Sequence, residues 1–200
     1  MNSETVLALV IGYLLGSIPF GLLLTHLAGK GDIRDIGSGN IGATNVLRTG
    51  SKVLAAATLM LDAVKGAAAV LIAQNLWPDA VNYAAVGALV GHLYPAWLRF
   101  QGGKGVATLL GILAPLFWQA ALVYAVVWLG LLLALRISSV AGMIAAASAP
   151  ITAAVLGNMA LVPMLLGFAL LIIWKHNENI RRLLKGEEPK VGKKKVEGPA

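Results

Sequence analysis

Six long apolar runs alternate with short polar segments along this 200-residue chain. The runs cover residues 6–28, 53–73, 81–98, 106–135, 140–156 and 161–174. Most of them are close to the roughly 20 residues that an α-helix needs to cross the apolar core of a bilayer. The pattern therefore predicts one all-α, polytopic transmembrane domain at residues 1–186, followed by a basic, disordered cytoplasmic tail at 187–200.

Composition is typical of a membrane protein rather than of a soluble globular protein. Hydrophobic residues make up 58% of the chain, charged residues make up 12%, and the mean hydropathy is +0.79. A soluble domain of this size rarely has such values. The first run is longer than the h-region of a signal peptide, and Glu4 precedes it where a signal peptide is basic. We therefore expect a retained first helix.

The residue types in the sequence do not indicate a metal site or a cofactor site. Cysteine is absent, which excludes disulfides and thiolate metal ligands. No cluster of carboxylates or histidines suggests a required ion. We expect neither a metal nor a cofactor.

The positions of the basic residues predict the topology. Of the 16 Lys and Arg residues, only Lys65 lies inside an apolar run. The others occur at residues 30–52, at Arg99 and Lys104, at Arg136, and after Trp174. Positively charged connections face the cytoplasm, so we expect these segments inside. This topology also explains the net charge of +7, and we expect no nucleic-acid partner.

The run at 106–135 decides the number of passes. As one straight helix its 30 residues would reach about 45 Å, whereas an apolar core is about 30 Å thick. One pass would also place the Lys-rich C-terminus outside. Two short passes with a turn near residues 115–119 satisfy the charge rule and predict about seven transmembrane helices, with the N-terminus outside and the C-terminus cytoplasmic. Five or six helices remain the alternative if the run is one irregular element.

The polar segment from Asp32 to Arg48 has the composition of a phosphate site. Glycines let backbone N–H groups approach a ligand, Ser, Thr and Asn side chains add hydrogen bonds, and arginines add positive charge. These residues are Gly31, Gly37, Gly39 and Gly42, then Ser38, Asn40, Thr44 and Asn45, and finally Arg34 and Arg48. Topology alone does not require so many glycines and amides, so we expect an anionic ligand here.

A second polar segment, at 91–108, is predicted on the same face of the membrane. It contains His92 and the turn Gly102-Gly103-Lys104-Gly105 before the next apolar run. The free N–H groups and the positive dipole at a helix N-terminus favour an anion. The turn is not a Walker A motif, because its spacing differs and no strand precedes it. Taken alone, it is a weak signal.

A third polar segment, at 175–184, continues the last run into the cytoplasm. On a helix, His176 and Asn179 are neighbours three residues apart, and Lys175, Asn179 and Arg182 lie on a similar face. One basic, amide-bearing face is therefore expected to close over the site.

Several residues also have purely structural interpretations. A basic residue at a cytoplasmic helix end, such as Arg99, usually sets topology and contacts lipid headgroups. Gly87 and Gly91 have the spacing of a small-xxx-small packing seam. Asp62 and Lys65, three residues apart within one run, either pair for structural reasons or take part in function. The sequence leaves both interpretations open.

Six distinct motifs follow one another over almost the whole chain. They are Gly16 to Gly21, Gly37 to Arg48, Asp62 to Gly66, Gly91-His92 with Pro95, Gly102 to Thr108, and Lys175-His176 with Asn179 to Leu184. In these motifs and their separations the chain resembles the bacterial membrane glycerol-3-phosphate acyltransferases that use acyl phosphate as donor, the PlsY family. Three long motifs at matching separations make the resemblance specific.

The resemblance implies transfer of a fatty acyl group from acyl phosphate to the 1-hydroxyl of sn-glycerol 3-phosphate, giving lysophosphatidic acid and inorganic phosphate. The implied location is the bacterial cytoplasmic (inner) membrane, with the active site facing the cytoplasm. The implied partners are these small-molecule and lipid substrates and the lipid bilayer, with a functional link to the enzyme that makes acyl phosphate. Acyltransferases that use thioesters carry His followed five positions later by Asp, a pair that is absent here.

The residues in the motifs receive roles as hypotheses. The candidate catalytic residues are Lys104, Arg48, His176, Asn179 and Ser38. The candidate substrate-binding residues are Gly37, Gly39, Asn40, Thr44, Asn45, Gly102, Gly103, Gly105, Ser139, Arg182 and His92. We expect direct attack by the glycerol hydroxyl without an acyl-enzyme. The proton acceptor stays open between His176, His92 and a substrate phosphate oxygen.

The alternative function is a small transporter or channel for an organic phosphate, since glycine- and proline-interrupted helices and buried charges are also transporter features. The polar motifs gather on one face, and no inverted repeat is visible. These two observations favour the enzyme.

Overall fold

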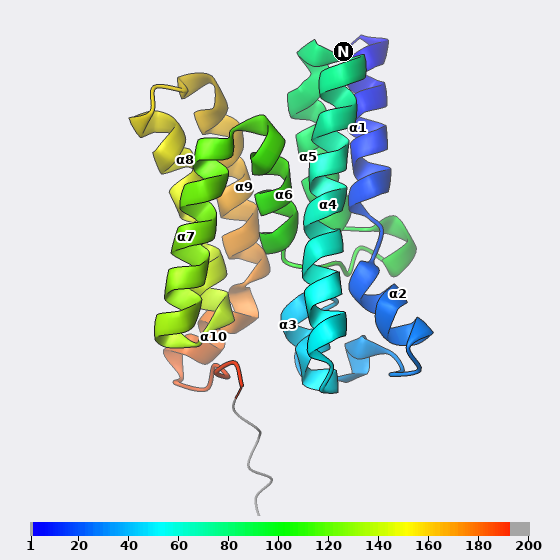
Figure 1. Ribbon diagram of the computed structural model, residues 1–200, viewed down its shortest axis with the longest axis vertical. Helices are drawn as coiled ribbons and strands as arrows, with labels where there is room; N and C mark the ends of the chain where they lie inside the picture. Colours follow the sequence, from blue (N-terminus) through cyan, green and yellow to red (C-terminus); the bar gives the residue numbers. More distant parts are fainter. Residues whose placement is uncertain (1, 193–200) are drawn as a thin grey trace, which may run out of the picture.

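The computed structural model describes residues 2–192, and helices with their connecting loops account for this range (Figure 1). Its α-helices are, in chain order, α1 (Ser3–Gly16), α2 (Phe20–Leu27), α3 (Ala43–Val46), α4 (Lys52–Leu76), α5 (Val81–Leu93), α6 (Val106–Leu116), α7 (Trp118–Leu135), α8 (Ser138–Val155), α9 (Val162–Lys175) and α10 (Asn177–Leu184). Short 3-10 turns are η1 (Ile33–Asp35), η2 (Leu47–Thr49), η3 (Pro78–Ala80), η4 (Ala96–Leu98) and η5 (Met159–Leu161). The all-α class is confirmed.

Four helical segments in the described range are long and apolar enough to cross a membrane. They are Ser3–Leu27, which contains α1 and α2, and then α4, α7 and α8. A fifth forms if Met159–Lys175 and the following helix α10, bent by 58°, are one span. Helices α5 and α6 are shorter, with 13 and 11 residues. The chain is a multi-pass membrane protein.

The helices stand in two groups that lie side by side (Figure 1). Helices α1, α4 and α5 pack on one another in the first group, and α7, α8 and α9 pack in sequence in the second. Helix α6 joins the groups, because it contacts both α4 and α7. The short helices α2, α3 and α10 lie together at one end, the lower end in Figure 1.

Prolines and other local signals set the helix ends. Pro19 precedes α2 and separates it from α1, because proline has no N–H group to continue the hydrogen bonding of a helix. Ser51 caps α4, since its side chain accepts a hydrogen bond from the N–H of Leu54 at 3.2 Å. Helix α5 ends at Leu93, five residues before the apolar run ends at Leu98, because Pro95 cannot continue a helix.

The long run at 106–135 divides into two helices, as the charge rule predicts. Helix α6 ends at Leu116 and α7 begins at Trp118, with the extended residue Phe117 (φ −158°) between them. Pro115 lies in the last turn of α6, where a missing N–H group and a bulky ring favour a break. The two helices pack on each other (Figure 1), which identifies the turn near residues 115–119.

Glycines bring α1 and α5 into backbone contact. A Cβ atom at Gly87 would lie 2.2 Å from the carbonyl oxygen of Leu9, and one at Gly91 would lie 2.3 Å from that of Tyr13. The facing helix uses Gly12 against Ala84 in the same way, at 2.3 Å. The predicted packing seam at Gly87 and Gly91 is confirmed, and close backbone approach is how helices gain contact area in an apolar solvent.

A second glycine seam joins the two helix groups. A Cβ atom at Gly111 of α6 would lie 1.8 Å from the carbonyl oxygen of Ala63 in α4, and one at Gly66 would lie 2.5 Å from that of Thr108. The beginning of α6 is therefore held directly against the middle of α4. This contact fixes the position of the turn that precedes α6.

We expect Gly87→Ala to destabilise the protein by about 1–3 kcal/mol, because the new methyl group collides with the backbone of α1. The midpoint of thermal unfolding in detergent measures this effect. The matched control is Gly130→Ala in α7, where no atom lies within 4 Å of the added Cβ and the midpoint should stay or rise slightly. Equal midpoints for the two variants would contradict the seam.

Candidate active site

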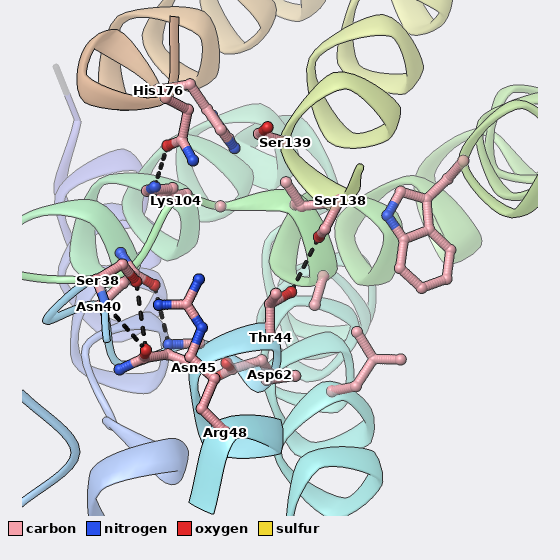
Figure 2. Close-up of a pocket in the computed structure, with 18 of the residues that line it drawn as sticks. Ser38, Asn40, Thr44, Asn45, Arg48, Asp62, Lys104, Ser138, Ser139 and His176 are labelled. Carbon is pink, nitrogen blue, oxygen red and sulfur yellow. Dashed lines mark hydrogen bonds between the residues drawn. The ribbon is translucent and has the colours of Figure 1, made fainter. Parts of the chain in front are cut away.

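Most of the predicted site residues surround one cavity of about 120 Å³. It lies where α3, the turn before α6, the start of α8 and the junction of α9 with α10 meet (Figure 2). The predicted residues that line it are Ser38, Asn40, Thr44, Asn45, Arg48, His92, Lys104, Gly105, Ser139, His176 and Asn179. Three polar segments that are far apart in the sequence therefore form one site.

Asn45 organises the loop that carries Ser38. Its side-chain oxygen accepts a hydrogen bond from the N–H of Ser38 at 3.1 Å, and its side-chain nitrogen donates to the carbonyl of Ile33 at 2.8 Å. The residue is only 2% exposed. Because both ends of this amide are bonded to protein, Asn45 shapes the loop and holds Ser38 at the cavity wall.

Gly37 makes room for Arg48. Its φ of +59° is the left-handed region that favours glycine. A Cβ atom there would also lie 2.2 Å from a terminal nitrogen of the Arg48 guanidinium. Figure 2 shows Arg48 lying between Ser38 and Asn45, with its side chain toward the cavity. The guanidinium can therefore reach an anion in the cavity.

The glycine turn before α6 is bonded to the end of α5. The N–H groups of Gly102 and Gly103 donate to the carbonyls of Leu93 at 3.2 Å and His92 at 3.0 Å. Gly105, with φ +86°, is the N-cap of α6, and the first turn of that helix lines the cavity. The first N–H groups of a helix have no partner inside it. The N–H groups at the start of α6 are therefore available to an anion, whereas those of Gly102 and Gly103 are bonded within the turn.

Lys104 projects into the cavity and donates a hydrogen bond to the side-chain oxygen of Asn179 (Figure 2). Burial and, to a smaller extent, the positive charge of Arg182 lower the pKa of Lys104 to about 8, against the opposing effect of Glu188. An ammonium group that has lost water is a strong partner for a phosphate. Lys104 is therefore the cation best placed to bind one.

Glu188 joins this network from the segment after α10, and the sequence analysis did not identify it. It accepts hydrogen bonds from Ser139 at 2.7 Å, Asn179 at 2.6 Å and Arg182 at 2.7 Å. Burial alone raises the pKa of Glu188, but these three hydrogen bonds outweigh it and hold the pKa below its usual value. The negative charge of Glu188 therefore offsets the positive charges of Lys104 and Arg182.

The sequence carried a signal for the end of α10 but not for the return of the chain to the site. Gly186 follows α10 with φ +72°, as a glycine that ends a helix does. The division between a domain at 1–186 and a tail at 187–200 stays a prediction; Glu188 and the N–H of Val191, which donates to the carbonyl of Arg136 at 2.7 Å, contact the helices. Residues 193–200 of that predicted tail lie outside the described residues.

His176 lies buried at the junction of α9 and α10. Its Nδ1 is 2.7 Å from the carbonyl oxygen of Ile172, which only accepts, so Nδ1 carries a proton. In a neutral ring, Nε2 then has a free lone pair. His176 lines the cavity beside Asn179, and Figure 2 shows its ring near Ser139.

The cavity also has an apolar wall. Leu59 of α4 and Trp128 of α7 line it, and these two helices make few direct contacts. A hydrogen bond of 2.9 Å between the hydroxyls of Thr44 and Ser138 crosses from α3 to α8 at this side (Figure 2). One cavity is therefore lined both by cationic and by apolar side chains.

A second cavity of about 250 Å³ shares Ser38, Asn40 and Lys104 with the first. Gly39 and Lys175 line it, and the Lys175 ammonium lies 4.6 Å from the centre of the Tyr94 ring. Four predicted substrate-binding residues line neither cavity, namely Gly37, Gly102, Gly103 and Arg182. Their direct contact with substrate stays a prediction. Within residues 2–192, no three His, Asp or Glu side chains gather as metal ligands.

Comparison with known proteins gives one consistent family. The family model described as glycerol-3-phosphate acyltransferase matches residues 6–186. The glycerol-3-phosphate acyltransferase of Mesorhizobium japonicum is 57% identical over 97% of this chain and 100% of its own length. That of Erythrobacter litoralis is 57% identical over 96% of this chain and 98% of its own.

Solved structures agree with these relatives. The crystal structure of PlsY, an integral membrane glycerol 3-phosphate acyltransferase, in its glycerol 3-phosphate form superposes with a TM-score of 0.89 at 38% identity, over 95% of this chain and 96% of that one. The lysophosphatidic acid form gives 0.86 at 37% identity, over 94% and 95%.

We expect Glu188→Ala to destabilise the protein by about 2 kcal/mol, because three donors lose a charged acceptor whose side chain is 7% exposed. Thermal unfolding in detergent measures the effect. The neighbouring Glu187 is exposed, so Glu187→Ala is the matched control and should unfold as the wild type does. A Glu188→Ala protein as stable as this control would contradict the network.

Proposed function

This chain belongs to the glycerol-3-phosphate acyltransferase family, and we propose that its acyl donor is an acyl phosphate. The reaction transfers the acyl group to the 1-hydroxyl of sn-glycerol 3-phosphate and gives lysophosphatidic acid and inorganic phosphate. It would be the first acylation step of phospholipid synthesis, dependent on the enzyme that makes acyl phosphate.

The observation that carries the proposal is a cavity whose lining is both cationic and apolar. Lys104 and Arg48 line it, and so do Leu59 and Trp128. An acyl phosphate has the same division, with a phosphate on one end of a long hydrocarbon chain. A thioester donor carries no phosphate at the reacting carbonyl, so cations there would have less to stabilise. The His and Asp pair of thioester-dependent enzymes is also absent from the sequence.

The mechanism that follows is direct transfer. The 1-hydroxyl oxygen attacks the carbonyl carbon of the mixed anhydride, the bond from that carbon to the phosphate oxygen breaks, and phosphate leaves with the electron pair. Lys104 and Arg48 stabilise the charge on the leaving phosphate, together with the N–H groups at the start of α6. Ser38 and Thr44 add hydrogen bonds, and His176 with Asn179 orients the glycerol phosphate.

The proton of the attacking hydroxyl goes to a substrate phosphate oxygen in this proposal. Phosphate monoesters have a second pKa near 6, so the dianion is a suitable base at neutral pH. His176 is the protein alternative, because its Nε2 is free to accept. His92 fits less well, since its ring lies against Gly103. We favour the phosphate because it is already at the reacting centre.

We further propose seven passes, with the N-terminus outside, the C-terminus in the cytoplasm and the site facing the cytoplasm of the inner membrane. The division of 106–135 into α6 and α7 supports this count, and the basic residues support the orientation. The transporter alternative has less support. Both cavities share Ser38, Asn40 and Lys104, which favours one site over a path across the membrane.

We expect purified protein in detergent to release inorganic phosphate from palmitoyl phosphate only when sn-glycerol 3-phosphate is present, with formation of lysophosphatidic acid. Palmitoyl-CoA in place of palmitoyl phosphate is the control and should give no product. Transfer from palmitoyl-CoA alone would overturn the proposed donor, while release of phosphate without acyl transfer would overturn direct transfer.

We expect kcat/KM for sn-glycerol 3-phosphate to fall as pH rises above about 8, because Lys104, whose pKa is lowered to about 8, then loses the charge that binds phosphate. Below about pH 6 it should fall again as the substrate phosphate gains a proton. Lys104→Ala should lower kcat/KM about 100-fold and remove the alkaline fall. Lys185→Ala, which removes an exposed lysine at the end of α10, is the control and should keep the wild-type profile.

A further inference from the structure

Three ionisable side chains lie buried close to the glycine turn, and the mechanism above does not use them. They are Asp62 and Lys65 of α4 and His92 of α5, which are 3%, 3% and 4% exposed. Ionisable residues within a membrane-spanning helix are costly and are commonly functional.

The partners of Lys65 satisfy it without a ligand. Its ammonium lies 2.7 Å from Oδ1 of Asp62 and donates to the carbonyl of Ile18 at 2.7 Å. The ring of Phe20 lies 5.8 Å away. Ile18 and Phe20 are at the break between α1 and α2, where the Ile18 carbonyl also accepts a hydrogen bond from the N–H of Phe20 at 3.2 Å. Lys65 therefore ties α4 to this break and offsets the charge of Asp62.

His92 is left without a partner for one of its ring nitrogens. Its Nδ1 lies 3.8 Å from Oδ1 of Asp62, the oxygen that the Lys65 ammonium approaches to 2.7 Å, and within the described range Nδ1 makes no hydrogen bond. Both residues line the cavity that holds Lys104. A carboxylate accepts and an imidazole N–H donates, so the two atoms match each other. Buried polar atoms without partners cost about 1–3 kcal/mol, and such bonds often tighten only when substrate binds.

His92 connects this pair to the glycine turn. Its carbonyl accepts the N–H of Gly103 at 3.0 Å, and a Cβ atom at Gly103 would lie 2.1 Å from its Nε2. The ring therefore rests on the backbone immediately before Lys104. If the ring moves far enough to form the hydrogen bond to Asp62, the turn must move as well, because the ring and the backbone of Gly103 are in contact.

We propose that Asp62 and His92 are a positioning pair that sets the Gly102–Lys104 turn for the phosphate of sn-glycerol 3-phosphate. When that phosphate binds Lys104, Nδ1–H of His92 donates to Asp62, and the bond fixes the ring beneath Gly103. Lys65 supplies the charge that lets Asp62 remain there. The inference rests on the proposed function, since it assigns these residues to the acceptor substrate.

Two double variants test the pair without leaving a buried charge unpaired. Asp62→Leu/Lys65→Met removes both charges and the acceptor for His92, whereas Asp62→Asn/Lys65→Met removes both charges and keeps an acceptor oxygen. Replacing a buried ion pair by apolar residues is often tolerated. We expect the Leu variant to raise KM for sn-glycerol 3-phosphate about tenfold, with KM for palmitoyl phosphate unchanged, and the Asn variant to stay near the wild type.

Equal kinetics for the two double variants would overturn the proposal, because Asp62 would then serve only to offset Lys65. Should the Leu variant fail to fold, single changes at His92 decide. His92→Asn keeps a donor at the position of Nδ1, and His92→Gln keeps one at the position of Nε2. The pair requires the Asn variant to have the lower KM for sn-glycerol 3-phosphate, and equal or reversed values would overturn it.

Calorimetric binding of sn-glycerol 3-phosphate to the same variants separates the two proposals. A wild-type protein that binds this ligand but transfers no acyl group from palmitoyl phosphate would remove the proposed donor. The order of affinities among the variants would still support or overturn the pair.

Discussion

A positive charge placed beside apolar helices needs an anion or a dipole close by, and the rest of this structure depends on how that requirement is met. Lys104 has lost much of its water, which lowers its pKa to about 8. Asn179 accepts from it, and Glu188 accepts in turn from Asn179, Ser139 and Arg182. The lysine is thereby held in place, and within residues 2–192 no carboxylate forms an ion pair with it. It keeps its capacity to bind a phosphate, because a carboxylate bonded to it directly would compete with that phosphate.

The glycine seams make this arrangement possible in a small chain. Backbone contact between α1 and α5 and between α4 and α6 leaves no layer of side chains between these helices. Short helices such as α5 and α6 can then end inside the protein, where their connecting turn carries Lys104. Helix α4 also carries the ion pair between Lys65 and Asp62, at 2.7 Å. The same helix therefore provides both a packing seam and buried charged side chains.

Much of the fold could be predicted from the sequence. Apolar runs locate the helices, and the charge rule correctly divides 106–135 at a turn near Phe117. The loop glycines, Arg48, Lys104 and His176 are found because polar residues are conspicuous between apolar runs. Other features were not visible. Helix α5 ends before its apolar run does, and Glu188 is one acidic residue in a polar segment, where nothing local distinguishes it from a solvated side chain.

The sequence by itself determined the class of protein, the helical segments and the residue types available for binding an anion. These properties follow from hydropathy, charge and local backbone preference, which act over a few neighbouring residues. Only the tertiary structure decided which of these residues share a cavity, that the side-chain amide of Asn45 bonds to the loop, and that Asp62 lies 3.8 Å from His92. Such distances depend on how helices far apart in the chain pack, and local patterns carry no information about that packing.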